Sequence, residues 1–585
     1  MHGGARLARH PDSHGLIAPS TRRLPIGAAP LGVAAVLAAL VITAVVVAAR
    51  GSHYLPVGDH ALTELRVRDV GHHPVVAGLY SRDGWSHPGP MMFFLLAPLY
   101  RLAGGASVAI DLGAVLVNVV GVAGMGLVAH RRGGPSLLVC TLVGTALLLR
   151  ALGAGFVADP WNTSITVLPF GLLVFLVWAM TCGDAWALPA GVVTATFLAQ
   201  THVGFVVLAL PLLAVGAGWL VVDVVRRARG WRSLVRAAVV AVALGAVLWL
   251  PVLADAVNGA PDNLARVVDW FRHEHSAHSL LQGVRVVSGQ LGGRPEWLVS
   301  RRPPLGVTGE PAYLYRAPFP WVLVLVVAAG ALFVRRHVDG GVRLVAVVVC
   351  TCVVAVVAVM RTVGLAYDYR LRWTWVIGMV AAVVVAWAAT VALERWRQLL
   401  AVVAAGSLVI ACTVDVVAAA SARPARAADS RVMRAIVPDV LREVGDVRGP
   451  VLVDDGPYEL ASDYGRGLLL QLERHGVDAR MRNRDRAIVG DHRVLDGARV
   501  ARHLVVAQDG EIAARDAEPG LRRIASWSSV TAAEVRTYRQ TEARLDRLVA
   551  AGDLTPIEEA FRLRAIALGD HDPAFAWAIA VYVAS

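Results

Sequence analysis

Long apolar runs recur along most of the chain, and polar segments separate them. Eleven runs of about membrane length lie at about 31–49, 106–130, 135–157, 161–180, 185–200, 203–225, 236–254, 318–335, 342–361, 372–393 and 398–420. A helix that crosses a bilayer needs about 20 mostly apolar residues. The pattern therefore predicts a polytopic α-helical membrane protein with about eleven transmembrane helices.

Three segments near the N-terminus differ from the apolar runs that follow them. Residues 1–30 are rich in Arg, His and Pro, which predicts a disordered cytoplasmic N-terminus. The run at 31–49 ends like a signal peptide, but its apolar stretch exceeds the usual length of about 7–15 residues, so we expect an uncleaved first span. The segment 89–103 is apolar but has only about three quarters of the length needed to cross, which indicates a re-entrant or interfacial segment.

Arginine clusters predict the orientation. They lie at 131–132, 226–232, 335–336 and 395–397. With eleven alternating spans, all four fall on the side of the N-terminus, and cytoplasmic loops are the ones enriched in Arg. We therefore expect a cytoplasmic (inner) membrane protein with a cytoplasmic N-terminus. Its outer face then carries the loops 51–105 and 255–317, the turns near 159–161, 202 and 362–371, and everything after residue 420.

The region 421–585 differs in kind, because its charge rises and long apolar runs stop. The pattern predicts strands at 449–455 and 501–508, a helix over 458–476 that Gly476 closes, and a helix to about residue 550 that a capping box of Thr531 and Glu534 begins. A strand–helix–strand order indicates a C-terminal extracytoplasmic α/β domain.

Composition adds two exclusions. All 56 basic residues are Arg and the net charge is +12, which we assign to cytoplasmic loops and a solvated tail and not to nucleic-acid binding. The five cysteines lie in or beside apolar runs without metal-ligand spacing, so neither a disulfide framework nor a structural zinc site is expected: Cys140, Cys182, Cys350, Cys352 and Cys412.

The first outer loop carries the candidate chemistry. It contains four acids and four histidines: Asp59, Glu64, Asp69, Asp83, His60, His72, His73 and His87. A solvated loop can carry such charges without function. Asp59, however, follows the first span by only about nine residues, and the loop returns to the membrane through His87-Pro88-Gly89-Pro90. Transfer of a sugar from a lipid phosphate to a hydroxyl needs a base at the membrane surface, which favours Asp59 as that base.

At these residues the chain resembles the GT-C superfamily of polyprenyl-phosphate-sugar-dependent glycosyltransferases, especially the group of protein O-mannosyltransferases and aminoarabinose transferases. Members open the first outer loop with an acid and close it with His-Pro, as "GDHALTE" and "GLYSRDGWSHPGP" do here. The resemblance implies a GT-C-like domain over 31–420, an inverting transfer, and Asp59 as the base. A second acid often follows in the family. Here it is His60, so either Glu64 or Asp83 takes that role or the role is absent.

Further outer-face residues fit the resemblance as substrate-binding groups: His60, His87, Asp159, Trp161, His202, Tyr367, Tyr369, Arg370 and Arg372. An Arg fork suits a donor phosphate. Each residue also has a structural interpretation, since Trp and Tyr form interfacial belts, Arg extends to the interface, and His202 can bond between helices.

The predicted function is transfer of a sugar from a polyprenyl-phosphate donor to a hydroxyl of a glycan, lipid or protein acceptor. No metal ligands are assigned, a divalent cation remains possible, and membrane lipid is the expected environment. Two alternatives stay open. A transporter or flippase for lipid-linked sugars would need mid-membrane charges, which the spans almost lack. A polyprenyl-diphosphate-dependent glycan ligase would use the loop 255–317, which carries His273, His275, His278, Arg285, Arg294, Arg301 and Arg302.

Overall fold

A computed structural model gives the fold of the chain. It describes residues 53–584 apart from 82, 154, 228–229, 259–261, 274–276, 300–309, 422–425, 457–461, 496, 498, 530–531 and 553–577, and before residue 53 only 39, 42–46 and 49. The predicted disordered N-terminus, most of the predicted first span, and Thr531 of the predicted capping box lie outside the described residues.

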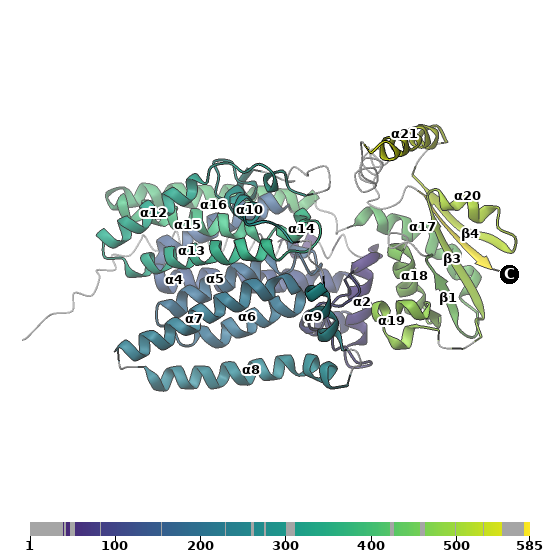
Figure 1. Ribbon diagram of the computed structural model, residues 1–585, viewed down its shortest axis with the longest axis horizontal. Helices are drawn as coiled ribbons and strands as arrows, with labels where there is room; N and C mark the ends of the chain where they lie inside the picture. The colour runs from purple at the N-terminus through teal and green to yellow at the C-terminus, as the bar shows by residue number, and fades with distance from the viewer. Residues whose placement is uncertain are drawn as a thin grey trace, which may run out of the picture.

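The molecule consists of a helical bundle and a C-terminal domain that contains a sheet (Figure 1). The bundle contains α2 (Gly58–Asp69), α3 (Met91–Leu102), α4 (Val108–Leu152), α5 (Val167–Thr181), α6 (Ala187–Thr201), α7 (Val206–Arg227), α8 (Trp231–Asn258), α9 (Asn263–His273), α10 (Leu280–Gln290), α11 (Glu296–Val299), α12 (Trp321–Arg335), α13 (Asp339–Met360), α14 (Asp368–Leu371), α15 (Thr374–Ala392) and α16 (Arg397–Ser421). The helix α2 packs against α3 and also against the C-terminal domain.

The apolar runs form helices, as the sequence predicts. Among the described residues, five helices are long and apolar enough to cross a membrane by length and composition: those at 108–152, 203–226, 231–257, 339–360 and 374–392. Large apolar side chains on α8 remain exposed, among them Val239, Val242 and Val247, as expected of a helix that faces lipid. The chain is a multi-pass membrane protein, while the count of eleven spans stays a prediction.

The helix α4 is a hairpin of two apolar helices. Its backbone leaves the helical region at Gly134, with φ 73° and ψ −170°. A Cβ built on Gly126 would lie 3.3 Å from Leu138 and 3.9 Å from Leu142. Residues 12 and 16 positions apart in a straight helix would be about 18 and 24 Å apart, so the chain reverses at Gly134. The two spans predicted at 106–130 and 135–157 are therefore antiparallel neighbours.

Segments predicted on the same face of the membrane meet at the same end of the bundle. At the arginine-rich end, the turn at 131–134 meets the turn after α5, where Arg132 bonds Asp184 at 2.5 Å. The end of α7 and the start of α8 lie at the end that points away from the C-terminal domain (Figure 1). At the other end, Trp161 bonds Asp59 at 3.0 Å. The alternation of the predicted loops between two ends is thus present in the fold.

Two predicted outer segments contain helices. The predicted re-entrant or interfacial segment at 89–103 forms α3, a single helix of 12 residues. The loop 255–317 contains α9, α10 and α11, and α10 packs so closely on α13 that a Cβ on Gly283 would lie 2.8 Å from the carbonyl oxygen of Val356. His275, Arg301 and Arg302 of this loop lie outside the described residues.

The C-terminal domain is an α/β domain with a five-stranded sheet. Its elements are α17 (Ala427–Val444), β1 (Val451–Asp454), α18 (Ser462–Arg474), β2 (Ala479–Arg480), α19 (Arg486–Val489), β3 (Arg502–Gln508), α20 (Glu511–Asp516), β4 (Leu521–Ser528), α21 (Ala532–Ala550) and β5 (Ala578–Ala584). The strand order is β2-β1-β3-β5-β4. β1 pairs in parallel with β2 and β3, whereas β5 pairs antiparallel with β3 and β4. The predicted strands at 449–455 and 501–508 and the helix that ends before Gly476 are confirmed.

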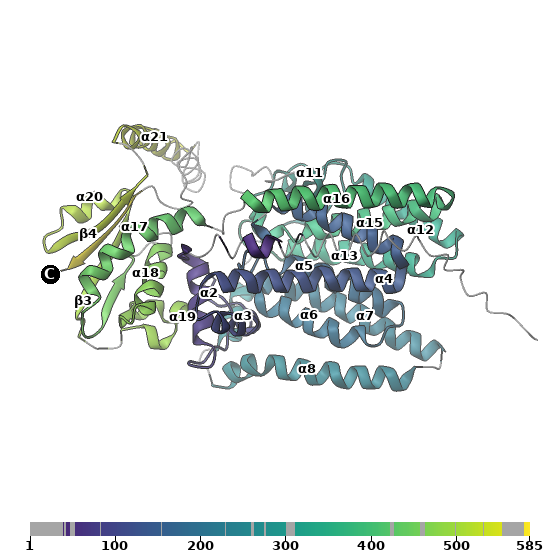
Figure 2. The same ribbon diagram turned by 180° about the vertical axis from the view of Figure 1, so that it is seen from behind.

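The sheet buries both of its faces. On β3, Leu504 and Val506 join the main core, while Val505 and Ala507 join a second cluster with Ile512 of α20. This alternation follows from the two-residue period of a strand. Figure 2 shows α17 and α18 on the side of the sheet that faces the bundle, and α18 packs against α2.

Candidate active site

Asp59 stands at the start of α2, one residue after Gly58, and its side chain is 38% exposed. The indole nitrogen of Trp161 donates a hydrogen bond of 3.0 Å to Oδ2. A guanidinium nitrogen of Arg466 lies 3.8 Å from Oδ1, which is beyond hydrogen-bond distance. One carboxylate oxygen is therefore fixed in place, and the other keeps lone pairs for an incoming donor.

Asp159 is a second carboxylate, tied to Asp59 through Trp161. Its Oδ1 lies 2.9 Å from Nε2 of His60 and accepts a 3.1 Å bond from the backbone N–H of Trp161, while the hydroxyl of Ser164 donates to Oδ2 at 2.6 Å. Burial by itself would raise the pKa of Asp159, but these hydrogen bonds hold it below its ordinary value. Asp159 is thus an ionised anchor that holds the turn from which the Trp161 ring reaches Asp59.

A row of aromatic rings leads away from Asp59. The ring centroid of Trp161 lies 4.7 Å from that of Tyr369, and Tyr369 stacks on Tyr367 at 5.5 Å with 10° between the planes. The guanidinium carbon of Arg370 lies 5.8 Å from the centre of the Tyr367 ring, within cation–π range. Indole and phenol faces of this kind can support the apolar face of a sugar ring.

The two predicted arginines differ in how their charge is balanced. Arg372 directs Nε and an Nη nitrogen at the same oxygen of Asp368, at 3.1 and 3.0 Å. Arg370 donates to the carbonyl oxygen of Val363 at 3.1 Å and lies 3.9 Å from Asp83. The charge of Arg370 is therefore less fully compensated, and of the two side chains it is the better placed to meet an anion.

His87 and His202 lie side by side, with ring centroids 4.6 Å apart. Nδ1 of His87 accepts from the backbone N–H of Val203, and Nδ1 of His202 accepts from that of Gly204. Burial lowers the pKa of both imidazoles, that of His202 to about 3, and the charge of Arg370 lowers both further. Both rings are neutral with the proton on Nε2, so they can act as hydrogen-bond donors but not as cations.

Two amide side chains hold the His-Pro segment in place. The side-chain oxygen of Gln200 accepts from the backbone N–H of Met91 at 3.2 Å. Asn263, the first residue of α9, accepts from the N–H of Ser86 at 2.7 Å and donates to its carbonyl oxygen at 2.8 Å. These bonds fix the backbone on both sides of His87. Sequence reasoning missed Asn263, because no motif marks it.

Glu64 lies apart from this group. It follows Asp59 by five positions on α2, which places the two side chains about 140° apart around the helix. It is buried and bonds the hydroxyl of Tyr100 and the guanidinium of Arg474, each at 2.9 Å. The prediction that Glu64 replaces the missing second acid is not supported by this geometry. Asp83, the other candidate, contacts Arg370, and the acid linked to Asp59 is Asp159.

A buried polar cluster lies behind α14. It joins Gln290, Glu296, Tyr313 and Asp368, and each has at least one side-chain atom without a hydrogen-bond partner within the described part of the chain. Burial, with the charge of Asp368, raises the pKa of Glu296 to about 8. Glu296 is therefore mainly protonated at neutral pH. Buried polar atoms are ordinarily paired, so this cluster suits water or ligand hydroxyl groups. Sequence reasoning missed it, since its members come from separate segments.

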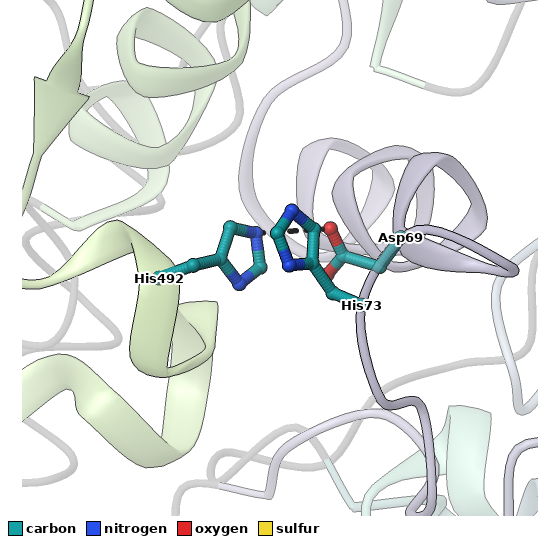
Figure 3. Close-up of side chains that lie close together, drawn as sticks. All are labelled: Asp69, His73 and His492. Atoms are coloured by element: carbon teal, nitrogen blue, oxygen red, sulfur yellow. Dashed lines mark ion pairs between the residues drawn. The ribbon is translucent and has the colours of Figure 1, made fainter.

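A third polar group joins α2 to the C-terminal domain. Figure 3 shows Asp69 and His73 facing His492, and their potential metal-ligand atoms all lie within 4.8 Å of one another. Two features disfavour a shared metal ion. Arg493 occupies both oxygens of Asp69 at 2.7 Å, and the His73 and His492 rings stack at 3.6 Å with 7° between their planes. A metal ion lies in the plane of each imidazole that binds it, and two rings stacked in this way share no such position within coordination distance of both. We interpret the group as an interdomain contact.

Comparison with known proteins identifies the fold. No protein-family profile and no curated protein matches the chain. The structure is similar to the crystal structure of ArnT from Cupriavidus metallidurans bound to undecaprenyl phosphate, with 14% identity and a TM-score of 0.50 over 85% of this chain and 96% of that chain. The same protein in the apo state gives 15% identity and a TM-score of 0.49 over 84% and 95%. The chain thus has the fold of ArnT, which is the GT-C-like membrane fold that its first outer loop predicts.

Proposed function

We propose that the protein is a glycosyltransferase that moves a sugar from a polyprenyl-phosphate donor to an acceptor hydroxyl at the outer face of the cytoplasmic membrane. Asp59 is the general base of an inverting single displacement. The acceptor oxygen bonds to the anomeric carbon while the bond from that carbon to the phosphate oxygen breaks. Its electron pair leaves with the polyprenyl phosphate, and Asp59 takes the acceptor proton.

The state of the Asp59 carboxylate is the observation that carries this proposal. A general base must be both oriented and reachable. Trp161 orients Oδ2, Oδ1 has lone pairs to spare, and the side chain is 38% exposed. Asp159, in contrast, has both oxygens engaged. The two acids therefore take different roles, with Asp59 as the base and Asp159 as the group that holds His60 and Trp161.

Groups near Arg370 suit the leaving phosphate. Arg370 offers a cation whose nearest carboxylate oxygen among the described residues is 3.9 Å away, and the neutral imidazoles of His87 and His202 lie close enough for the charge of Arg370 to lower their pKa. A cation together with neutral N–H donors stabilises charge that develops on a phosphate oxygen. Trp161, Tyr369 and Tyr367 would support the sugar between this phosphate and Asp59.

The fold supports a lipid-linked donor. ArnT, whose fold this chain shares, is bound to undecaprenyl phosphate in its structure. In this chain the candidate groups lie together at the ends of apolar helices. A lipid-anchored phosphate could reach them there, at the membrane surface. We therefore assign the donor to the polyprenyl-phosphate class.

The test is product formation by the purified protein. The full chain is reconstituted in liposomes with a panel of radiolabelled polyprenyl-phosphate sugars and a membrane extract, and products are identified by mass spectrometry. We expect free polyprenyl phosphate together with a sugar-bearing acceptor. Movement of the donor across the bilayer without product would instead identify a transporter. Product from polyprenyl-diphosphate donors alone would identify a glycan ligase.

The contribution of Arg370 to donor binding is tested in the same assay. Arg370→Gln removes the cation and keeps a polar but shorter side chain. We expect the KM for the donor to rise about tenfold or more, because a charge-assisted contact to the phosphate is lost. An unchanged KM would remove Arg370 from the donor site.

A further inference from the structure

The C-terminal domain approaches the candidate active site through Arg466, which lies near the start of α18. One of its guanidinium nitrogens lies 3.8 Å from Oδ1 of Asp59 and 3.7 Å from Oδ1 of Asp463. The side chain is only 14% exposed, so packing fixes its position. Asp59 therefore has a neighbour on each side, with Trp161 from the membrane bundle and Arg466 from the C-terminal domain.

Close backbone approach sets this arrangement. A Cβ on Gly467 of α18 would lie 3.1 Å from the backbone carbonyl oxygen of Pro56, and a Cβ on Gly58 would lie 2.7 Å from the side-chain oxygen of Asp463. Gly58 also has a φ of 54°, which side chains other than glycine rarely adopt. The segment that leads into α2 therefore packs closely against α18. This packing places Arg466 beside Asp59.

The surroundings of Arg466 indicate what it does. Besides Asp59 and Asp463, the charge of Arg466 acts on Asp455 and Asp485. Asp463 also pairs with Arg426, and Asp455 and Asp485 also lie near Arg484. Arg466 is therefore suited to hold a carboxylate in position, and Asp59 is the most exposed carboxylate that it faces.

We propose that Arg466 is a positioning residue of the transfer reaction, an inference that rests on the proposed function. It holds Asp59 so that Oδ1 points toward the acceptor while Trp161 holds Oδ2. The base is then correctly placed only when α18 is packed on α2. In this way the C-terminal domain completes the active site of the membrane domain.

The test compares variants of the full chain in the reconstituted transfer assay. Arg466→Gln should lower kcat about 10–100-fold with the donor KM within about twofold, because it disturbs the base and not the donor site. Arg466→Lys keeps the charge and should stay within about threefold of the wild-type kcat. Thermal unfolding in detergent monitors the fold of each variant.

Arg68→Gln is the matched control. It breaks another ion pair between α2 and α18, since Arg68 lies 2.9 Å from Glu473 and both side chains are about a quarter exposed. We expect Arg68→Gln to lower the Tm about as much as Arg466→Gln does. Its kcat should stay within about twofold of the wild-type value. The inference is overturned if Arg466→Gln keeps the wild-type kcat. It is also overturned if Arg68→Gln lowers kcat as much as Arg466→Gln does and the kcat of Arg466→Lys is no higher than that of Arg466→Gln. Absence of wild-type turnover would overturn the proposed function and, with it, this inference.

Discussion

Trp161 links the two carboxylates of the candidate site. Its ring packs against Tyr369, its backbone N–H bonds Asp159, and its indole nitrogen bonds Asp59. Trp161→Phe keeps an aromatic ring and removes the bond to Asp59. We expect kcat to fall about 10–100-fold, since a hydrogen bond to a charged group contributes about 1.5–3 kcal/mol and about 1.4 kcal/mol corresponds to a factor of ten. The Tm should change by about 2 °C or less. An unaltered kcat in the transfer assay would mean that the indole does not orient the base.

Glu296 predicts how the stability of the protein depends on pH. Its pKa is raised from 4.5 to about 8, mainly by burial. Between these values the folded protein holds a proton that the unfolded chain has lost, so this group makes stability fall as pH rises, by at most about 1.4 kcal/mol per unit. Glu296→Gln resembles the protonated acid and should weaken the decrease in Tm between about pH 5 and pH 8. Equal slopes for the two proteins would contradict the buried, protonated state.

Sequence reasoning found the residues of the candidate site that follow the outer ends of predicted spans. Asp59, Trp161 and Arg370 are of this kind, because span ends with polar residues are visible in the hydropathy pattern. Asn263 and Arg466 carry no such mark, since their contacts to Ser86 and Asp59 join residues 177 and about 400 positions apart in the sequence. The side to which Glu64 points depends on the helix that the loop forms, which the sequence pattern did not predict.

Among elements, long apolar helices were predictable and short ones were not. Length and hydropathy define α7, α13 and α15, whereas α9 and α10 have 11 residues each and mixed polarity. Strand β4 was missed because arginines interrupt its apolar pattern. Strand β5 joins the sheet between β3 and β4 from the far end of the chain, and such pairing cannot be read from local pattern.

The hairpin in α4 depends on Gly134. Its φ of 73° and ψ of −170° are accessible to glycine almost alone, and a Cβ there would meet no atom within 4 Å. Gly134→Ala should therefore lower the free energy of unfolding by about 1–3 kcal/mol through backbone strain alone. Gly218→Ala is the control, since that helical position also has open space around it, and helix propensity makes it neutral or slightly stabilising. The Tm values of both variants measure the difference. Equal effects would argue against a strained turn.

At the scale of the whole molecule, apolar helices form a belt between two polar ends. The candidate active site lies at one of these ends. The sequence predicted both parts of the chain and their order. It did not predict their contact, in which α18 lies along α2 with ion pairs at Glu64 and Arg68. That contact joins residues about 400 positions apart, and its partners have no shared local pattern.

The proposed orientation gives an expectation for the intact cell. Asp491 of the C-terminal domain has a side chain that is 83% exposed, and Arg232 lies exposed at the arginine-rich end. A membrane-impermeant maleimide should label Asp491→Cys in intact cells. It should label Arg232→Cys only after the membrane is opened. The wild-type protein is the background control, because its cysteines are buried or partly buried. The reverse labelling order would invert the proposed topology.

The role of Asp59 as the base is the central claim, and Asp59→Asn tests it most directly. The amide keeps the size of the side chain and its contact with Trp161 but cannot take a proton. We expect the purified variant to insert normally, to keep its Tm and donor KM, and to lose about 10²–10⁴-fold in kcat, the usual contribution of a general base. A variant that transfers sugar at near the wild-type rate would contradict the account.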